Sequence, residues 1–339
     1  GTRQKMWYNT PMFRTVQSAN VQGKAVLVRM DLDLPKRGRG YDETRLDNGL
    51  ESLHWLLKQD AKTVTVVGHL GRPGGKRIFA FSLKKIEKLL RSKFTKDENK
   101  KIKVLENLRF DSGEEKNSVL FAKKLAKGQD LFVNDAFASS HEEHASIVGV
   151  PRLLPSYLGF QFQKELEGLE KAVHEPKRPL VAILGGAKLS TKMHLLKPLE
   201  EKVDVLLVGG KMATELVQHP VENRKLIVGQ LTKDGKDISP PTIEQFIRFI
   251  QMAQTVVWNG PLGKYEDKAY RRGTYAIAQF LSHSRAYTIA GGGDTEAALT
   301  AFNMKKGIKF ISSGGGAMLE YIAFGTLPGI KAVEASPKR

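Results

Sequence analysis

Short apolar runs alternate with segments of helical periodicity along most of the chain. Lys24–Asp31 and Thr63–Gly68 are nearly continuous apolar runs, whereas Leu46–Lys58 and Ser82–Arg91 place apolar residues at helical spacing. Continuous apolar runs are typical of strands in a parallel sheet that is covered on both faces. The alternation therefore predicts an α/β fold built from doubly wound parallel sheets.

The pattern changes between Pro151 and Pro179, where an irregular stretch precedes one amphipathic helix, predicted over Phe162–His174. With 339 residues, two cores are expected. We predict an N-terminal domain over 1–160, a connecting helix and hinge over 161–178, a C-terminal domain over 179–322, and a tail over 323–339 that returns to the N-terminal domain. The strands predicted for the C-terminal domain are Leu180–Leu184, Val203–Val208, Thr255–Trp258, Ala286–Ala290 and Lys309–Ile311.

Each strand of the C-terminal series is followed by glycine, in the sequences GGAK, GGK, NGPLG, GGGD and SSGGG. Glycine lets the backbone approach a ligand, and the N-terminus of the next helix favours anions. Tight turns alone explain one or two of these glycine clusters better than all five, so the series predicts a phosphate or nucleotide site. A Walker A motif is absent and no GxGxxG follows a strand, which disfavours P-loop NTPases and dinucleotide-dependent dehydrogenases.

Charged side chains follow the strands of the N-terminal half. Asp31 and Asp33 follow one strand, His69 and Arg72 the next, and Arg109 a third. The ends of parallel strands gather at one rim, and Arg binds phosphate or carboxylate bidentately. The sequence therefore predicts an anion site, the alternative being that each Arg caps a helix or pairs with a surface carboxylate. His141 and His144 lack the spacing of a zincin motif.

The charge balance raises a second class of partner. Lys and Arg number 54 against 36 Asp and Glu, a formal net charge of +18. Nucleic-acid binding is one explanation, but aromatic residues are not interleaved with the basic runs, so a basic surface or an anionic substrate is favoured. The absence of cysteine excludes disulfides and thiolate metal sites. We expect a cytoplasmic protein with no membrane span, because no apolar run is long enough to cross a bilayer.

Several longer motifs together resemble one family. VLVRMDLDLP, YDETR, GHLGRP, LENLRF and VNDAFASSHEEHASIVG occur in the first half; AILGGAKLSTK, VVWNGPLGKYE, AGGGDTEAA and ISSGGGAMLEYI occur in the second. In this order, from about Gly23 to Pro328, they are similar to the signature segments of phosphoglycerate kinases. The resemblance implies two Rossmann-like domains joined by a helix, a hinge that closes, and a monomer. It also implies Mg²⁺ as cofactor, with 3-phosphoglycerate or 1,3-bisphosphoglycerate on the N-terminal domain and ADP or ATP on the C-terminal domain.

The resemblance also assigns roles residue by residue. The catalytic set it implies is Arg45, Lys188, Gly293 and Gly316. The substrate-binding set is Asp31, Asp33, Arg45, His69, Arg72 and Arg109. The nucleotide-binding set is Gly185, Gly186, Ala187, Lys188, Lys192, Gly209, Gly210, Asn259, Pro261, Glu266, Gly291, Gly292, Gly293, Asp294 and Thr295. Asp294 is the implied magnesium ligand.

Five features depart from the family pattern. Asp33 replaces an Asn, Glu142 an Arg, Thr191 an Asp and Lys211 a Gly, and the segment after Leu216 is short by about one βα unit. These changes leave open an impaired homologue that only binds nucleotide or has another role, and the net charge of +18 leaves open a nucleic-acid binder. The main hypothesis is an active kinase, because Arg45, Lys188, Lys192, Glu266 and Asp294 are all present.

Overall fold

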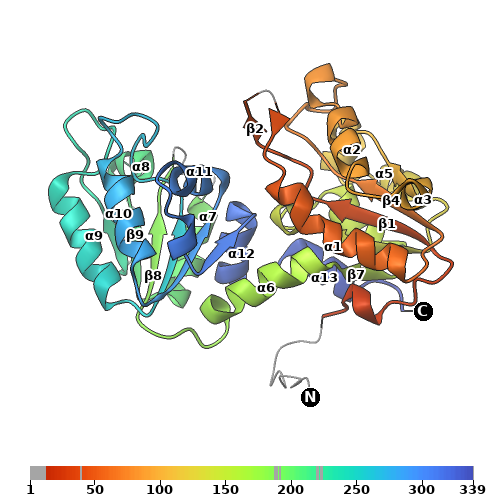
Figure 1. Cartoon of the computed structure of the whole chain (residues 1–339). Helices are drawn as coiled ribbons and strands as arrows, with labels where there is room; N and C mark the ends of the chain where they lie inside the picture. The colour runs from red at the N-terminus through yellow and green to blue at the C-terminus, as the bar shows by residue number, and fades with distance from the viewer. Residues whose placement is uncertain are drawn as a thin grey trace, which may run out of the picture. The chain divides into compact units, whose positions relative to one another are not determined.

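The computed structural model describes residues 13–38, 40–186, 190, 192–218, 221 and 224–338. Their contacts separate two compact units, each with its own sheet and helices (Figure 1). Unit 1 contains the described residues as far as Ala136, together with Glu142–Gln163 and the described residues from Pro328 onward. Unit 2 contains Phe137–His141 and Lys164–Leu327. The C-terminal segment therefore belongs to the same unit as the N-terminal half.

Unit 1 is built on a five-stranded sheet with the strand order β5-β4-β1-β6-β7, and all its pairs are parallel. A separate antiparallel pair, β2 and β3, follows β1 in the chain. The strands are β1 (Ala25–Met30), β2 (Lys36–Arg37), β3 (Gly40–Tyr41), β4 (Thr63–Val67), β5 (Ile102–Val104), β6 (Leu131–Asp135) and β7 (Ser156–Leu158).

Both faces of this sheet are covered, as the sequence of β1 requires. Val26, Val28 and Met30 pack in one core with α1 and α2, whereas Leu27 packs in a second core with α5. The two cores arise because successive side chains of a strand point to opposite faces. The helices of unit 1 are α1 (Thr44–Lys58), α2 (Lys84–Arg91), α3 (Lys96–Lys101), α4 (Ser112–Glu115), α5 (Val119–Ala126) and α13 (Pro328–Glu334).

Local signals set the ends of several elements. Thr95 and Glu98 form a capping box at the start of α3, with each side chain bonded to the other's backbone amide. Ser336, beyond α13, accepts a hydrogen bond from Arg14 at 2.7 Å, which ties the C-terminal segment into unit 1. Short turns complete the unit: η1 (Val16–Ser18), η2 (Phe79–Phe81), η3 (Leu108–Phe110), η5 (Ala145–Gly149) and η6 (Val150–Arg152).

Unit 2 contains a six-stranded parallel sheet with the order β10-β9-β8-β11-β12-β13. Along β11, Val256 and Trp258 pack in a core with α9 and α10, and α7 and α12 contact each other elsewhere in the unit. The strands are β8 (Leu180–Leu184), β9 (Val205–Val208), β10 (Leu226–Val228), β11 (Thr255–Asn259), β12 (Tyr287–Gly291) and β13 (Phe310–Ser312).

The helices of unit 2 begin and end at recognisable residues. Ser239 caps α9 and is followed by Pro240, a residue that suits the first helical turn. Gly325 ends α12 in the left-handed conformation, with φ of 71°. The elements are η4 (Phe137–Ser139), α7 (Met193–Lys202), α8 (Lys211–Gln218), α9 (Pro240–Met252), α10 (Arg272–Ser282), α11 (Gly293–Ala301), η7 (Lys305–Gly307) and α12 (Gly315–Phe324). Helix α6 (Phe160–Val173) contributes residues to both units.

The predicted α/β class with doubly wound parallel sheets is confirmed. One strand is missing from the series predicted for the C-terminal domain: Leu226–Val228 forms β10 at the edge of the unit 2 sheet, within the segment predicted to be short. Its three apolar residues, set between Lys225 and Gly229, are too few to show a period in the sequence. No helix within the described parts of the chain is long and apolar enough to span a membrane.

Each sheet has a point at which the strand order reverses direction. In unit 1 this point lies between β1 and β6, and in unit 2 it lies between β8 and β11. Ligands of open α/β sheets bind beyond the carboxyl ends of the strands at such points. The residues that follow these four strands are therefore the first candidates for function.

Candidate functional site

At the switch point of unit 1, the buried Arg29 determines the tautomer of His69, which is predicted to bind substrate. Arg29 in β1 is fully buried, and its Nη2 lies 3.0 Å from Nδ1 of His69. Arginine only donates, so Nδ1 of His69 accepts and Nε2 carries the ring proton. Burial lowers the pKa of His69 well below 6.5, and Arg29 and Arg109 lower it further. His69 is therefore a neutral hydrogen-bond donor at neutral pH.

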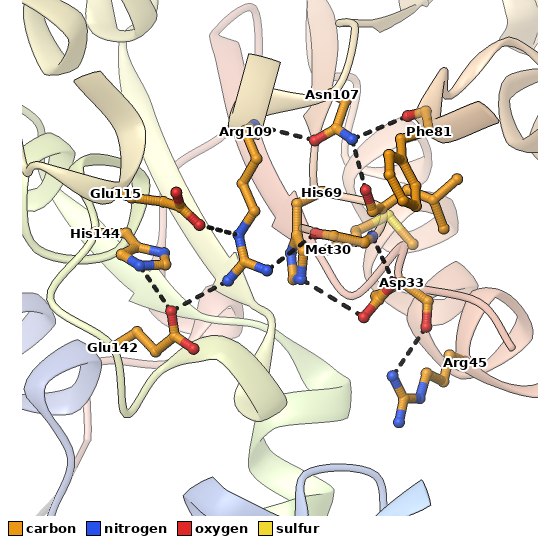
Figure 2. A network of polar contacts seen from close by, with 12 residues as sticks. Met30, Asp33, Arg45, His69, Phe81, Asn107, Arg109, Glu115, Glu142 and His144 are labelled. Carbon is orange, nitrogen blue, oxygen red and sulfur yellow. Dashed lines mark hydrogen bonds and ion pairs between the residues drawn. The ribbon is translucent and has the colours of Figure 1, made fainter. Parts of the chain in front are cut away.

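The carboxylate of Asp33 binds to the loop that follows β4. Its Oδ1 accepts a hydrogen bond from the Gly71 amide at 2.8 Å, and its Oδ2 lies 3.8 Å from Nε2 of His69. Its backbone carbonyl accepts a hydrogen bond from Nη1 of Arg45 at 2.9 Å (Figure 2). Asp33, which departs from the family pattern, is thus held by a backbone amide with His69 nearby, and Arg45 is anchored to the same loop.

Arg109 is a second buried cation of the cluster. It is 4% exposed, and its Nη1 donates to the Gly71 carbonyl at 3.1 Å. Its backbone amide bonds to Asn107, whose side-chain amide holds the Leu70 carbonyl at 2.7 Å. These bonds fix the guanidinium beside the loop that follows β4.

Two carboxylates face this guanidinium. Nε of Arg109 lies 3.4 Å from Glu115, and Nη2 lies 3.1 Å from Oε2 of Glu142. The same oxygen of Glu142 lies 2.7 Å from Nε2 of His144 (Figure 2). Glu142, which also departs from the family pattern, therefore pairs directly with Arg109, a residue predicted to bind substrate.

The structure brings four predicted substrate residues into one network, namely Asp33, Arg45, His69 and Arg109. Asp31 follows β1 directly and is 8% exposed. Arg72 is exposed and makes no hydrogen bond or ion pair with any residue that the structure describes. Fixed guanidinium groups and a neutral imidazole donor suit an anion with several oxygens.

In unit 2, the glycine loops at the switch point are bonded to one another. The Gly185 amide donates to the Asn259 carbonyl and the Gly186 amide to the Pro261 carbonyl, both at 2.9 Å. A Cβ on Gly185 would lie 2.2 Å from the Pro261 carbonyl oxygen, so only glycine fits there. The loops after β8 and β11 thus pack backbone to backbone.

Polar side chains brace these loops from below. Asn259 donates to the Gly291 carbonyl at 2.9 Å, and the hydroxyl of Thr295 accepts from the Gly260 amide at 2.7 Å. Both side chains belong to buried residues. Asn259 and Thr295 therefore join the loops that follow β11 and β12, and Gly209 is bonded to Leu184 of β8 at 3.0 Å.

A cavity of about 330 Å³ opens above the loops. Five of the residues that line it were predicted to bind nucleotide, and five were not. The predicted ones are Gly186, Gly210, Pro261, Glu266 and Asp294, and the additional ones are Lys211, Gly235, Lys236, Gly263 and Lys264. The additional lysines give the cavity the charge that a polyphosphate requires.

Lys192 lies beneath the same loops. Its Nζ donates to the Gly185 carbonyl at 2.7 Å. Burial lowers the pKa of Lys192 to about 8, while the charge of Asp294 opposes this shift. A phosphate near Lys192 would restore its pKa, because an anion favours the charged amine.

Asp294 fits the predicted role of magnesium ligand. Asp294 lies exposed in the first turn of α11, and its carboxylate makes no hydrogen bond with the described residues. No group of three acidic or histidine side chains suited to a metal occurs among the residues described. Mg²⁺ is commonly held by one or two carboxylates and the phosphates of the substrate, so the carboxylate of Asp294 at this cavity would suit it.

The predicted glycines lie at two helix starts. Gly291 ends β12, Gly292 has φ of 96°, and Gly293 begins α11, where an added Cβ would meet no atom within 4 Å. Gly316 is the second residue of α12, and a Cβ there would lie 3.2 Å from His141. Amides at these helix starts can bind phosphate oxygens. Ala187, Lys188 and Thr191 lie outside the described residues.

Sequence reasoning missed three cationic residues. Arg29 could have been identified from the sequence, because an arginine inside the apolar run VLVRM indicates a buried charge with a structural or functional role. Lys236 and Lys264 have none, because they lie in loops that meet only in the fold, where the Lys264 amide bonds to the Lys236 carbonyl at 2.9 Å.

Comparison with known proteins gives consistent matches. A family model described as phosphoglycerate kinase matches residues 16–226 and 219–324. A phosphoglycerate kinase of Finegoldia magna is 34% identical over 391 positions, covering 95% of this chain and 99% of the relative. One of Bartonella quintana is 37% identical over 393 positions with the same coverage of both chains. The solved structure of a phosphoglycerate kinase from Coxiella burnetii has a TM-score of 0.78 at 32% identity, and covers 95% of this chain and 99% of that chain.

These alignments also bear on the shortened segment. Both are longer than the 339 residues of this chain, so the relatives carry residues that it lacks. The two matches of the family model meet at residues 219–226, between α8 and β10. This is the segment that the sequence comparison predicts to be short.

Proposed function

The chain belongs to the phosphoglycerate kinase family, and we propose that its two clusters perform the reaction of that family. This reaction is the reversible transfer of a phosphoryl group between 1,3-bisphosphoglycerate with Mg-ADP and 3-phosphoglycerate with Mg-ATP. The enzyme class is a phosphotransferase with a carboxyl group as acceptor. The observation that carries the proposal is the presence of both a fixed arginine cluster in unit 1 and a glycine-lined, lysine-rich cavity in unit 2.

The unit 2 cavity is the proposed nucleotide site. Backbone amides at the start of α11 and the side chains of Lys192 and Lys211 would bind phosphate oxygens, because both features favour anions. Glu266 lines the same cavity and offers a carboxylate for ribose hydroxyls. Asp294 would hold Mg²⁺, which supplies neutralising charge to the phosphates when bound.

The unit 1 cluster is the proposed site for phosphoglycerate. Arg109 and His69 are fixed hydrogen-bond donors for the phosphate that does not react, and Arg45 is proposed to meet the phosphoryl group that is transferred. Phosphoryl transfer has a loose transition state with charge spread over three oxygens, so aligned cations stabilise it. The leaving carboxylate needs no general base, and Nδ1 of His69, the ring atom that could accept a proton, already accepts a hydrogen bond from Arg29.

Transfer further requires the two bound ligands to meet with water excluded. We propose that Lys188, by its place in the GGAK segment, contacts the same phosphoryl oxygens as Arg45. Both cations would then stabilise charge that exists only during transfer. From the family resemblance, we also propose that the two domains close on the bound ligands and that the protein is a monomer.

The direct test is a coupled assay with Mg-ATP and 3-phosphoglycerate. The proposal expects ADP release that depends on both substrates and saturates with each. An inactive homologue that only binds nucleotide would give a calorimetric signal with Mg-ADP but no turnover at saturating substrate. Binding to nucleic acid that falls steeply with salt and does not compete with nucleotide would instead favour the remaining alternative.

The lowered pKa of Lys192 predicts a pH dependence of nucleotide affinity. In the free protein, Lys192 loses its proton as the pH rises through about 8. A phosphate bound beside Lys192 would keep the amine protonated over this range. The Kd for Mg-ADP should therefore rise about tenfold between pH 7.5 and 9.5. Titration calorimetry across this range measures it, and the phosphates of ADP do not titrate there.

The matched control for this prediction is Lys192→Arg, because arginine stays protonated throughout the range. Its Kd should change little between the two pH values. An equal rise in the wild type and the variant would assign the dependence to another group.

A further inference from the structure

We propose that Glu142 is an internal competitor for the anionic substrate, with its carboxylate placed where a substrate oxygen would bind. The inference rests on the proposed function, because it assumes that the unit 1 cluster receives the phosphate of phosphoglycerate. It adds a residue that sets substrate affinity in this chain.

The geometry of one oxygen carries the argument. Oε2 of Glu142 lies 3.1 Å from Nη2 of Arg109 and 2.7 Å from Nε2 of His144 (Figure 2). A guanidinium and an imidazole that converge on one oxygen are the arrangement with which proteins hold a phosphate oxygen. The carboxylate therefore occupies a ready-made anion position.

The surrounding donors are buried and incompletely satisfied. Arg109 is 4% exposed and His144 is 9% exposed. Nδ1 of His144 has no hydrogen-bond partner within the described parts of the chain, and Nε of Arg109 has no hydrogen bond there but only the longer contact with Glu115 at 3.4 Å. Buried polar atoms in folded proteins are normally paired, so these atoms indicate a cluster that a ligand completes better than Glu142 does.

Glu142 is more exposed than the two residues that it contacts. The side chain of Glu142 is 26% exposed, whereas those of Arg109 and His144 are 5% and 11% exposed. Arg109 is also tied to the Gly71 carbonyl, so it stays in place when Glu142 moves. A half-buried glutamate can rotate into water, and the cost of leaving its contacts with Arg109 and His144 subtracts from the affinity for substrate.

Charge gives the same direction. Glu115 already lies 3.4 Å from Nε of Arg109, so two carboxylates face a single guanidinium. An incoming phosphate would be repelled by Glu142 unless that side chain turns away. Removing the charge of Glu142 should therefore strengthen substrate binding and leave the nucleotide site of unit 2 unchanged.

The test compares the wild type with Glu142→Gln and Glu143→Gln. Glu143 is exposed and adjacent in sequence, so its variant removes the same formal charge without touching Arg109. The KM for 3-phosphoglycerate should fall about tenfold in Glu142→Gln, as expected when a charge-assisted contact becomes a neutral one. It should stay unchanged in Glu143→Gln, and the KM for Mg-ATP should stay unchanged in both.

An unchanged or higher KM for 3-phosphoglycerate in Glu142→Gln would overturn the inference. Glu142 would then be a positioning residue that holds Arg109 and His144 in place. A fall of equal size in Glu143→Gln would also overturn it, because the effect would come from overall charge.

Direct binding keeps this test separate from that of the proposed function. Titration calorimetry with 3-phosphoglycerate, and separately with inorganic phosphate, needs no turnover. Tighter binding of 3-phosphoglycerate to Glu142→Gln than to the wild type supports the inference even if neither protein turns over, and equal affinities contradict it. Thermal unfolding of both variants confirms that the comparison is made between folded proteins.

Discussion

Replacing Arg45 by methionine should lower kcat about a thousandfold and leave the affinity for Mg-ADP unchanged. Arg45 is half-buried near the start of α1, and its Nη1 is anchored to the Asp33 carbonyl at 2.9 Å. Methionine keeps much of the apolar length of the side chain but removes the charge. Because the proposed role of Arg45 is to stabilise charge on the transferring phosphoryl group, the loss should fall on kcat rather than on nucleotide binding.

The measurement combines initial rates at saturating substrates with calorimetry of Mg-ADP. Arg152→Met is the matched control, since Arg152 is an exposed arginine of the same unit. Its kcat should stay within about twofold of the wild type, as expected for a surface substitution. A kcat that is equally preserved in Arg45→Met would remove Arg45 from the proposed mechanism.

Replacing Asp294 by asparagine should abolish most of the magnesium-dependent part of nucleotide binding. Asp294 lines the unit 2 cavity, and it is the only carboxylate of that cavity in the first turn of α11 among the described residues. Asparagine keeps the size of the side chain and removes the charge that Mg²⁺ prefers. The kcat/KM for Mg-ATP should fall by about a thousandfold.

Two readouts test this prediction. The first is the initial rate as a function of Mg²⁺ concentration, and the second is the Kd of ADP measured with and without Mg²⁺. Glu296→Gln serves as control, because Glu296 lies in the same turn but pairs with Lys305 at 2.6 Å. If Mg²⁺ strengthened ADP binding equally in Asp294→Asn and in the wild type, the metal would have another ligand.

Much of the fold followed from local patterns in the sequence. Continuous apolar runs such as Leu180–Leu184 marked buried parallel strands, and glycine after each strand marked the loops of the unit 2 site. These signals are local because one strand and its following turn suffice to produce them. Strand β10 could not be predicted in this way, because three residues at a sheet edge are too few to show a hydrophobic period.

The state of the cluster in unit 1 could not be predicted in the same way. Sequence comparison marked Glu142 as a reversal of charge, but only the fold shows that its carboxylate bridges Arg109 and His144. The neutral state of His69 likewise depends on its burial in the fold and on Arg29, which is forty residues away in the chain. Lys236 and Lys264 meet because two loops pair in the fold. Such contacts depend on tertiary structure, and no pattern within one segment contains them.

We conclude that this chain transfers a phosphoryl group to a carboxyl oxygen. Hydroxylamine tests it directly, because it converts an acyl phosphate into a stable hydroxamate as the acyl phosphate forms. With Mg-ATP, 3-phosphoglycerate and hydroxylamine, we expect one hydroxamate for each ADP, and none when either substrate is omitted. Formation of ADP without hydroxamate, or no ADP at saturating substrates, would contradict it.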